Sequence, residues 1–344
     1  METIVKNFVI QISTITVSLT YCYFISSKLP KGIYRFISLI PIFYIFTILP
    51  LYCTSIFTTA ITFSFTTWLT NFKLIRFAFD LEQSPYHRSI SLLNFIIFTS
   101  LPIKSKRSST STKTPFLYKL GFQILIFSIL VQTVLDYRIR AHQNIVFIIY
   151  CGLLFLIIDI VSAVVNALMF ALIGLELEPS SNKPYMATSL QNFWGSWNLM
   201  VTNTLRYTVY KPVVTVFSNY KWAPLAGILA SFLVSGLMHE LFVYQLSREK
   251  ATWEMTRFFV IHGICVVVEM MIKRSLAGRR WRLPDFVATV LTVGFVTVTG
   301  FWLFFPPLVR RRLDVKVLQE FTRLDFLHLL FNIYKFAIFS LYTI

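Results

Sequence analysis

The sequence predicts an all-α membrane protein with about eight or nine transmembrane helices. Of its 344 residues, 56% are hydrophobic and 17% are aromatic, which is more apolar side chain than a soluble globule of this size needs. Several apolar runs also approach the ~20 residues that a helix needs to cross the hydrocarbon core of a bilayer. The chain is therefore expected to be a polytopic membrane protein.

Nine apolar runs define the expected spans. In chain order they lie at about residues 7–27, 36–51, 55–70, 116–135, 144–173, 223–246, 256–272, 285–306 and 325–344. The first run has no basic n-region and no small-residue cleavage site, so it is expected to be a retained span rather than a signal peptide. The stretch 91–103 is too short to span and favours an interfacial or re-entrant segment. No internal repeat or domain boundary is visible, so residues 1–344 are expected to form a single membrane-embedded domain.

The basic residues lie in short clusters between the apolar runs. The 32 Lys and Arg against 15 Asp and Glu give a formal charge of +17, and their placement indicates membrane topology and anionic headgroups rather than nucleic acid. An N-terminus in the lumen places Lys31, Arg76 and the polar, Ser/Thr-rich loop 104–113 in the cytosol, although Arg138 and 310–312 then fall on the wrong side. The four cysteines lie inside apolar segments without CxxC spacing, so neither a disulfide framework nor a metal site is expected.

The run 229–244 contains a histidine and a glutamate side by side among apolar residues. Ionisable groups at membrane depth cost roughly 2.5–3.5 kcal/mol on insertion scales, so they are retained where they pair, line a wet cavity or perform chemistry. On a helix, Ser235 and Gly236 share the face of His239, and Gly236 is expected to leave room for a substrate atom. The Ser235 hydroxyl is expected to bond the imidazole or a ligand. Glu240 lies about 100° around the helix and is expected to support a neighbouring helix or a cavity wall. A histidine satisfied by an adjacent helix remains an alternative.

The loop and helix start at 174–206 are unusually rich in Trp, Asn and Gly for a connector. Phe193, Trp194 and Trp197 suit either a substrate-binding segment or an aromatic belt at the membrane interface. Two further polar pairs, Asp159 with Asn166 and His262 with Glu269, are each seven residues apart. Interhelical hydrogen bonding is the preferred interpretation of both pairs, and a proton or ion relay is the alternative.

Missing motifs narrow the chemistry. The sequence has no GxSxG nucleophile elbow, no HExxH zinc pair, no GxxxxGK[ST] phosphate loop, and no histidine followed by Asp at the fourth or fifth position. A buried histidine without a nucleophile points to general-base work on a bound hydroxyl rather than to covalent catalysis.

Two linked motifs resemble the membrane-bound O-acyltransferase superfamily. They are SLQNFWGSWNLMVTNTLRYTVYKPV at 189–213 and FLVSGLMHELFVY at 232–244. The segments YCYFISSKLPKG, NFKLIRFAFD and GFVTVTGFWLFFP extend the resemblance over nearly the full length, to the plant wax synthase family of long-chain-alcohol O-fatty-acyltransferases. Members of that family read FWGRRWN where residues 193–198 read FWGSWN, so the role of the two arginines is not transferred to Ser196.

The resemblance implies a catalytic pair of His239 and Asn198. The residues expected to bind substrate are Phe193, Trp194, Trp197, Ser235, Gly236 and Glu240. It implies a buried catalytic chamber in which an acyl group passes from acyl-CoA to a lipid alcohol. His239 is expected to accept the hydroxyl proton, and Asn198 to orient it or to donate to the substrate carbonyl. No metal or other cofactor is expected, and the membrane is expected to be the endoplasmic reticulum.

The acceptor most consistent with the resemblance is a long-chain fatty alcohol, which gives a wax ester. Sterol and diacylglycerol are alternative acceptors. A membrane transporter or channel that uses Asp159, His239 and Glu269 is the alternative from another class, and it predicts proton-coupled flux without release of CoA.

Overall fold

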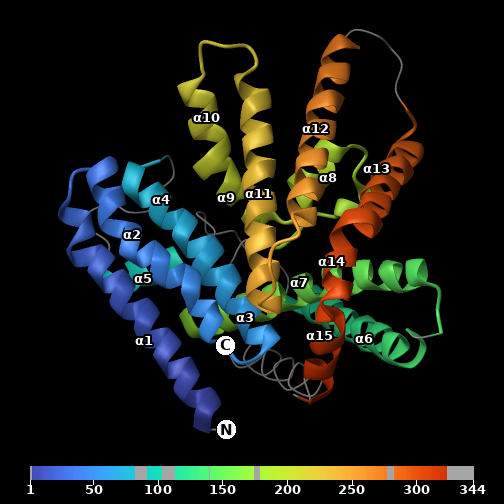
Figure 1. Cartoon of the computed structure of the whole chain (residues 1–344), viewed down its shortest axis with the longest axis horizontal. Coiled ribbons are helices and arrows are strands. Elements are labelled where there is room, and N and C mark those ends of the chain that lie inside the picture. The colour runs from blue at the N-terminus through green and yellow to red at the C-terminus, as the bar shows by residue number, and fades with distance from the viewer. Residues whose placement is uncertain are drawn as a thin grey trace. The chain divides into compact units, whose positions relative to one another are not determined.

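Long helices dominate the residues that the computed structural model describes, which are 2–81, 91–102, 113–138, 140–173, 179–276 and 283–323 (Figure 1). No strand occurs in these ranges. Seven of the described helical segments are long and apolar enough to cross a membrane by length and composition. They are Val9–Lys28, Ile33–Tyr52, Tyr118–Tyr137, Gln143–Ala167, Ala223–Ser247, Glu254–Ser275 and Asp285–Arg310.

These seven segments confirm the all-α, polytopic prediction and match seven of the nine expected runs. The run 325–344 lies outside the described residues, as do the loop 104–112 and residues 277–282. The run 55–70 is helical but is not among the seven candidate spans. The stretch 91–103 forms the short helix α5, Leu92–Ser100.

The chain divides into two compact units, and each unit combines two separate segments. Unit 1 comprises Met1–Pro102 and Val201–Met271, and unit 2 comprises Ile103–Met200 and Ile272–Ile344. A single domain over residues 1–344 stays a prediction.

Unit 1 contains the N-terminal helices and the helix that carries the histidine–glutamate pair. Its first segment runs through α1 (Glu2–Phe24), η1 (Ser26–Lys28), α2 (Ile33–Ile48), η2 (Leu49–Tyr52), α3 (Ile56–Thr62), η3 (Phe63–Thr70), α4 (Asn71–Phe79) and α5. Its second segment holds most of α9 (Leu199–Leu205), then η5 (Arg206–Tyr210), α10 (Lys211–Val216), α11 (Ala223–Ser247) and most of α12 (Glu254–Ser275).

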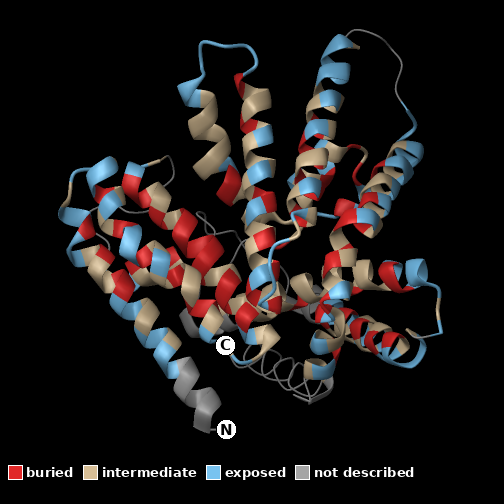
Figure 2. Ribbon diagram, viewed as in Figure 1, coloured by how far each residue is buried: buried red, intermediate tan, exposed pale blue. Residues whose placement is uncertain are grey.

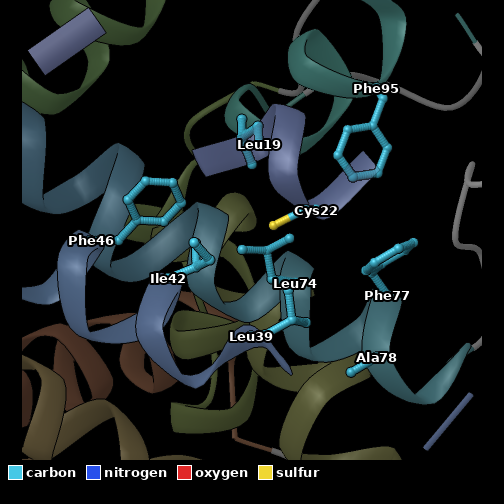
Figure 3. Close-up of a cluster of buried hydrophobic side chains, with 9 residues drawn as sticks. All are labelled: Leu19, Cys22, Leu39, Ile42, Phe46, Leu74, Phe77, Ala78 and Phe95. Atoms are coloured by element: carbon cyan, nitrogen blue, oxygen red, sulfur yellow. The ribbon is translucent and has the colours of Figure 1, made fainter. Parts of the chain in front are cut away.

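A buried apolar cluster joins the four helices α1, α2, α4 and α5 in unit 1. Leu39, Leu74 and Cys22 are completely buried in it, and Phe95 closes it from α5 (Figure 3). Figure 2 shows that much of α1 is exposed or half-buried, whereas η3 is mostly buried. Exposed apolar side chains such as Val17 fit a helix that faces lipid, because lipid tails are as apolar as the side chains.

The segment from α3 to α4 is continuous and contains a π-helix, η3, whose threonines point into the protein. The hydroxyls of Thr66 and Thr67 donate to the carbonyl oxygen of Phe46 at 3.2 and 2.7 Å. Buried hydroxyls that bond a neighbouring helix explain why residues 55–70 are helical and yet more polar than a lipid-facing span.

Helix α11 is tied to the start of unit 1 near its C-terminal end. Gln245 Nε2 donates to the carbonyl oxygen of Thr47 at 2.6 Å, and the guanidinium of Arg248 donates to that of Leu51 at 3.0 Å. These bonds fix α11 against the end of α2, so the face of α11 that carries His239 has a defined position within the unit.

Unit 2 is built on the antiparallel pair α6 (Lys113–Tyr137) and α7 (Gln143–Ile173). It continues with η4 (Pro184–Met186), α8 (Leu190–Trp197), α13 (Asp285–Thr299), η6 (Gly300–Phe304), α14 (Phe305–Arg310) and α15 (Leu313–Arg323). The Tyr150 hydroxyl donates to Asp314 at 2.8 Å, and Arg138 lies 3.9 Å from the same carboxylate. Phe147 stacks on Phe305 at 5.4 Å, so α7 is held to both α14 and α15.

Candidate active site

His239 lies on α11, a 25-residue helix with Pro224 in its first turn. Its ring Nδ1 is 2.8 Å from the carbonyl oxygen of Ser235, four residues earlier on the helix. A carbonyl oxygen only accepts, so Nδ1 carries the proton of the neutral imidazole and Nε2 is left as the proton acceptor. The ring bonds the backbone carbonyl of Ser235 rather than its hydroxyl, and the Ser235 side chain is buried. A bond from the Ser235 hydroxyl to a ligand stays a prediction.

Two aromatic rings contact the His239 imidazole. Phe259 of α12 lies 4.3 Å from it between ring centroids, with an interplanar angle of 32°, and Trp68 of η3 lies 5.2 Å away at 84°. Both aromatic side chains are buried. The general-base candidate therefore lies against apolar surface supplied by two other helices of the same unit.

Gly236 allows a close crossing of α11 and α12. A Cβ atom at this position would lie 2.9 Å from Thr256 Cα and 3.3 Å from Phe259 Cβ. The space beside Gly236 is therefore filled by α12. This corrects the expectation that Gly236 leaves room for a substrate atom, because the amount of space depends on the partner helix.

The Glu240 carboxylate holds the start of α12. Oε1 accepts the backbone N–H groups of Thr252 and Trp253 at 2.9 and 2.8 Å, and Oε2 accepts that of Thr256 at 3.3 Å. A negative group is favourable at a helix N-terminus, where the first N–H groups have no intrahelical acceptor. The prediction that Glu240 supports a neighbouring helix is confirmed. A contact of Glu240 with substrate stays a prediction.

The FWGSWN segment lies in unit 2 and forms most of α8. Ser189 caps the helix by accepting the Asn192 N–H at 3.2 Å, and Asn198 ends it in an extended conformation, with φ −144° and ψ 97°. Phe193 is buried and stacks on Trp197 at 5.4 Å, while Trp194 packs edge-on against Phe193.

This aromatic cluster extends to α7, because Phe155 contacts both Trp197 and Tyr185 at 6.0 Å. The structure therefore gives Phe193 and Trp197 a packing role. A contact of Phe193, Trp194 or Trp197 with substrate stays a prediction.

Asp159 joins α7 to α6 and to the loop that precedes α8. It accepts Gln123 Nε2 at 2.6 Å and Lys119 Nζ at 3.2 Å, and the Ser180 hydroxyl also donates to it. The predicted interhelical role of Asp159 is confirmed. A relay role for Asp159 has no support in these contacts, since they end on a loop. In α12, His262 is completely buried against Phe258 at 4.4 Å.

The same loop fixes the backbone on both sides of Asn198. Ser180 accepts the Leu199 N–H at 2.8 Å, and Asn182 donates its N–H to the Ser196 carbonyl at 2.9 Å. Asp159 accepts the Ser180 hydroxyl and so fixes Ser180, whose carbonyl oxygen accepts the N–H of Leu199. The motif thus has a rigid frame within unit 2.

The structure brings Ser235, Gly236, His239 and Glu240 together in unit 1, and Phe193, Trp194, Trp197 and Asn198 in unit 2. Sequence reasoning missed Trp68 and Phe259, because no spacing rule links either residue to His239. The threonines around Trp68 in residues 63–70 could have indicated its position, because a polar run in a helix is typical of a face that contacts protein rather than lipid. Among the described residues, no group of three or more His, Cys, Asp or Glu is arranged to hold a metal ion.

Comparison with known proteins identifies the family of this chain. Residues 177–261, which contain the FWGSWN segment, His239 and Phe259, match the model of the membrane bound O-acyl transferase family. "Probable long-chain-alcohol O-fatty-acyltransferase 1" of Arabidopsis thaliana is 38% identical, over 93% of this chain and 96% of its own length. "Acyl-CoA--sterol O-acyltransferase 1" of the same plant is 39% identical, over 90% and 92%. "Long-chain-alcohol O-fatty-acyltransferase" of Simmondsia chinensis is 39% identical, over 88% and 89%.

The helical membrane fold and the match to the family model identify a membrane-bound O-acyltransferase. Likeness over almost the whole chain narrows this further. The chain belongs to the long-chain-alcohol O-fatty-acyltransferase family, the wax synthase group of these enzymes.

Replacing Glu240 by Ala is expected to destabilise unit 1. It leaves the N–H groups at the start of α12 without their acceptor, which lowers the free energy of unfolding by about 1–3 kcal/mol. The measurement is denaturant-induced unfolding of the purified protein in mixed micelles. Glu249→Ala, at an exposed carboxylate two residues beyond the end of α11, is the matched control and is expected to change stability by less than about 0.5 kcal/mol. Equal stability of the two variants would contradict the capping role.

Proposed function

We propose that the protein transfers an acyl group from acyl-CoA to the hydroxyl of a long-chain fatty alcohol and so forms a wax ester. The observation that carries this proposal is 37–39% identity, over most of the chain, to seven relatives with long-chain-alcohol O-fatty-acyltransferase in their names. A sterol is the second candidate acceptor, because the sterol acyltransferase of Arabidopsis thaliana is just as similar. We also propose the endoplasmic reticulum as the membrane.

His239 Nε2 acts as the general base in this proposal. It takes the proton of the alcohol as the alcohol oxygen attacks the thioester carbonyl carbon, and a C–O bond forms. The tetrahedral intermediate then collapses with cleavage of the C–S bond. The proton on the imidazole passes to the departing thiolate, so the histidine returns to its neutral form. The bond from Nδ1 to the Ser235 carbonyl supports this role, because it keeps Nε2 as the basic nitrogen.

Asn198 supplies the second polar function in the proposal, through its side-chain amide. The amide either orients the histidine or donates a hydrogen bond to the substrate carbonyl, where negative charge develops. The fixed backbone on both sides of Asn198 supports the assignment, since a catalytic amide needs a defined position.

Apolar surroundings favour acyl transfer to an alcohol over hydrolysis. Phe259 and Trp68 cover part of the imidazole with aromatic surface, which leaves less room for water beside the base. Exclusion of water protects the thioester from hydrolysis while the lipid alcohol reacts.

Basic residues in unit 1 support an anionic acyl donor. The Arg76 guanidinium and the Lys211 ammonium lie 5.0 and 4.6 Å from the centroid of one ring, that of Tyr207. Two cations held at one aromatic side chain create a local positive potential that attracts phosphate groups. The predicted orientation places Arg76 on the cytosolic side, where the phosphates of acyl-CoA would approach.

The substitution His239→Ala is expected to reduce ester formation to background, because it removes the proton acceptor. The assay uses membranes of yeast that lack their own neutral-lipid acyltransferases, with radiolabelled palmitoyl-CoA and hexadecanol. His142→Ala, at a histidine in the turn between α6 and α7, controls for loss of a histidine and is expected to retain activity. Ester formation by His239→Ala at the wild-type rate, at equal protein level, would refute the general-base role.

The substitution Asn198→Ala is expected to lower kcat on the order of 100-fold, as loss of one transition-state hydrogen bond does. The protein level and thermal stability should match those of the wild type. Asn203→Ala, on α9, is the control for loss of an amide from the neighbouring helix. A fall in protein level that accounts for the lost activity would assign Asn198 a structural role instead.

The acceptor is tested by competition. Wild-type membranes receive labelled palmitoyl-CoA with hexadecanol, a sterol and diacylglycerol at equal concentrations, and the labelled products are separated. Wax ester is expected as the main product. A predominance of sterol ester would move the protein to the second candidate function, and uptake of protons without CoA release would indicate a transporter.

A further inference from the structure

Trp68 is a buried tryptophan in contact with the general-base candidate. Its side chain is 6% exposed and lies in the π-helix η3. Phe63 and Phe72 pack against the indole at 6.3 and 6.4 Å, and the His239 imidazole lies 5.2 Å away with the two ring planes nearly perpendicular. These contacts fix the indole from its own helix and from α11.

The indole N–H of Trp68 is buried without an acceptor. Within the described part of the chain, no oxygen, nitrogen or sulfur atom accepts a hydrogen bond from Nε1. An indole nitrogen only donates, so it cannot be satisfied by a neighbouring donor. Buried polar groups in native proteins nearly always have a partner, and an exception calls for an explanation such as a catalytic role.

The position of the Trp68 indole N–H indicates which acceptor it can bond. Because the indole and the imidazole are in contact, Nε1 lies no further from the imidazole than the width of an indole ring. π-Helical turns within helices frequently occur at functional sites. An oxygen atom of the reacting substrates is therefore the acceptor that fits the place, and it arrives when the substrates bind at His239.

The chemistry distinguishes the two oxygens that are available. A donor on the alcohol oxygen would withdraw electron density from the nucleophile and oppose its attack. A donor on the thioester carbonyl oxygen polarises the carbonyl and stabilises the negative charge that develops there. The second arrangement assists the reaction, and it needs no charge on the protein.

We propose that Trp68 is a catalytic residue whose indole N–H donates a hydrogen bond to the carbonyl oxygen of the acyl thioester. The inference rests on the proposed function. The alcohol oxygen forms a covalent bond to the carbonyl carbon as His239 takes its proton. The carbonyl oxygen becomes an oxyanion that accepts the hydrogen bond from the Trp68 indole N–H. When the carbonyl re-forms, the C–S bond breaks and the thiolate takes the proton from His239.

Trp68→Phe removes the donor and keeps an aromatic ring. We expect kcat for palmitoyl-CoA and hexadecanol to fall on the order of 100-fold, because the bond strengthens as charge develops, and KM for palmitoyl-CoA to rise by no more than about 10-fold. Trp222→Phe is the matched control, since Trp222 is 46% exposed at the start of α11 and lies in neither motif. Its kcat is expected to equal that of the wild type.

A second variant separates hydrogen bonding from shape. Benzothienylalanine at position 68, introduced by codon suppression, replaces the indole N–H with sulfur and keeps the bicyclic ring. It is expected to show the same loss of kcat as Trp68→Phe at wild-type thermal stability. Full activity of the benzothienylalanine protein would overturn the proposal, even if Trp68→Phe fails to fold.

The affinities of two non-reactive acyl-CoA analogues test the hydrogen bond directly. If Trp68 had only a structural role, the preference between the two analogues would not change when Trp68 is replaced. One is a ketone analogue of palmitoyl-CoA, with a methylene between sulfur and carbonyl, and the other is S-hexadecyl-CoA, which has no carbonyl. The wild type is expected to bind the ketone about 10-fold more tightly, and the two Trp68 variants to bind both compounds alike. Equal weakening of both compounds, or a retained preference for the ketone, would overturn the proposal.

The same experiments distinguish a failure of the Trp68 assignment from a failure of the proposed function. If the wild type forms ester and the Trp68 variants do so at the same rate, the assignment of Trp68 fails and the proposed function stands. If the wild type binds neither CoA analogue and forms no ester, the proposed function fails and the assignment of Trp68 fails with it.

Discussion

The bond between the Glu240 carboxylate and the start of α12 is the interaction on which the geometry around His239 depends. Three backbone N–H groups, from Thr252 to Thr256, converge on one buried side chain of α11. They fix where α12 begins and how closely it approaches α11. That approach is tight enough to require a glycine at position 236. It also places Phe259, one turn into α12, against the imidazole.

The adjacent residues His239 and Glu240 therefore have different roles, because they lie about 100° apart around α11. Glu240 faces α12 and accepts backbone N–H groups, so it stabilises the pair of helices. His239 bonds the carbonyl of its own helix through Nδ1, so Nε2 is the basic nitrogen of the neutral ring. The proposed general base is thus oriented by local backbone, and its orientation depends on the α11 helix remaining intact.

Most of the fold could be predicted from the sequence, because seven apolar runs of sufficient length encode seven candidate spans directly. The apolar residues of the run 55–70 predict a span, but Thr66 and Thr67 bond the Phe46 carbonyl of α2, and this contact between helices is not encoded in the local sequence pattern. At the site, the supporting role of Glu240 followed from its angle on the helix. Burial cost left two interpretations of His239, and the family resemblance implied its role as the base. The packing at Gly236 and the contact with Trp68 did not follow, since both depend on which helix faces α11. Sequence spacing within one helix carries no such information.

Recognition of the acceptor has a different physical origin from the chemistry of transfer. The relatives named for long-chain alcohols and for a sterol are about equally similar to this chain, at 38–39% and 39% identity. The proposed base at His239 would act on a hydroxyl proton, and a donor at Trp68 would act on the thioester carbonyl. The hydroxyl is common to every acceptor in question, and the thioester carbonyl belongs to the acyl donor, which does not change with the acceptor. Discrimination between a fatty alcohol and a sterol must therefore come from side chains that contact the hydrocarbon part, where one flexible chain and a rigid ring system differ in width. Substitutions that change acceptor choice without lowering kcat belong at those positions, and substitutions at the residues that handle the hydroxyl or the carbonyl should lower the rate with all acceptors alike.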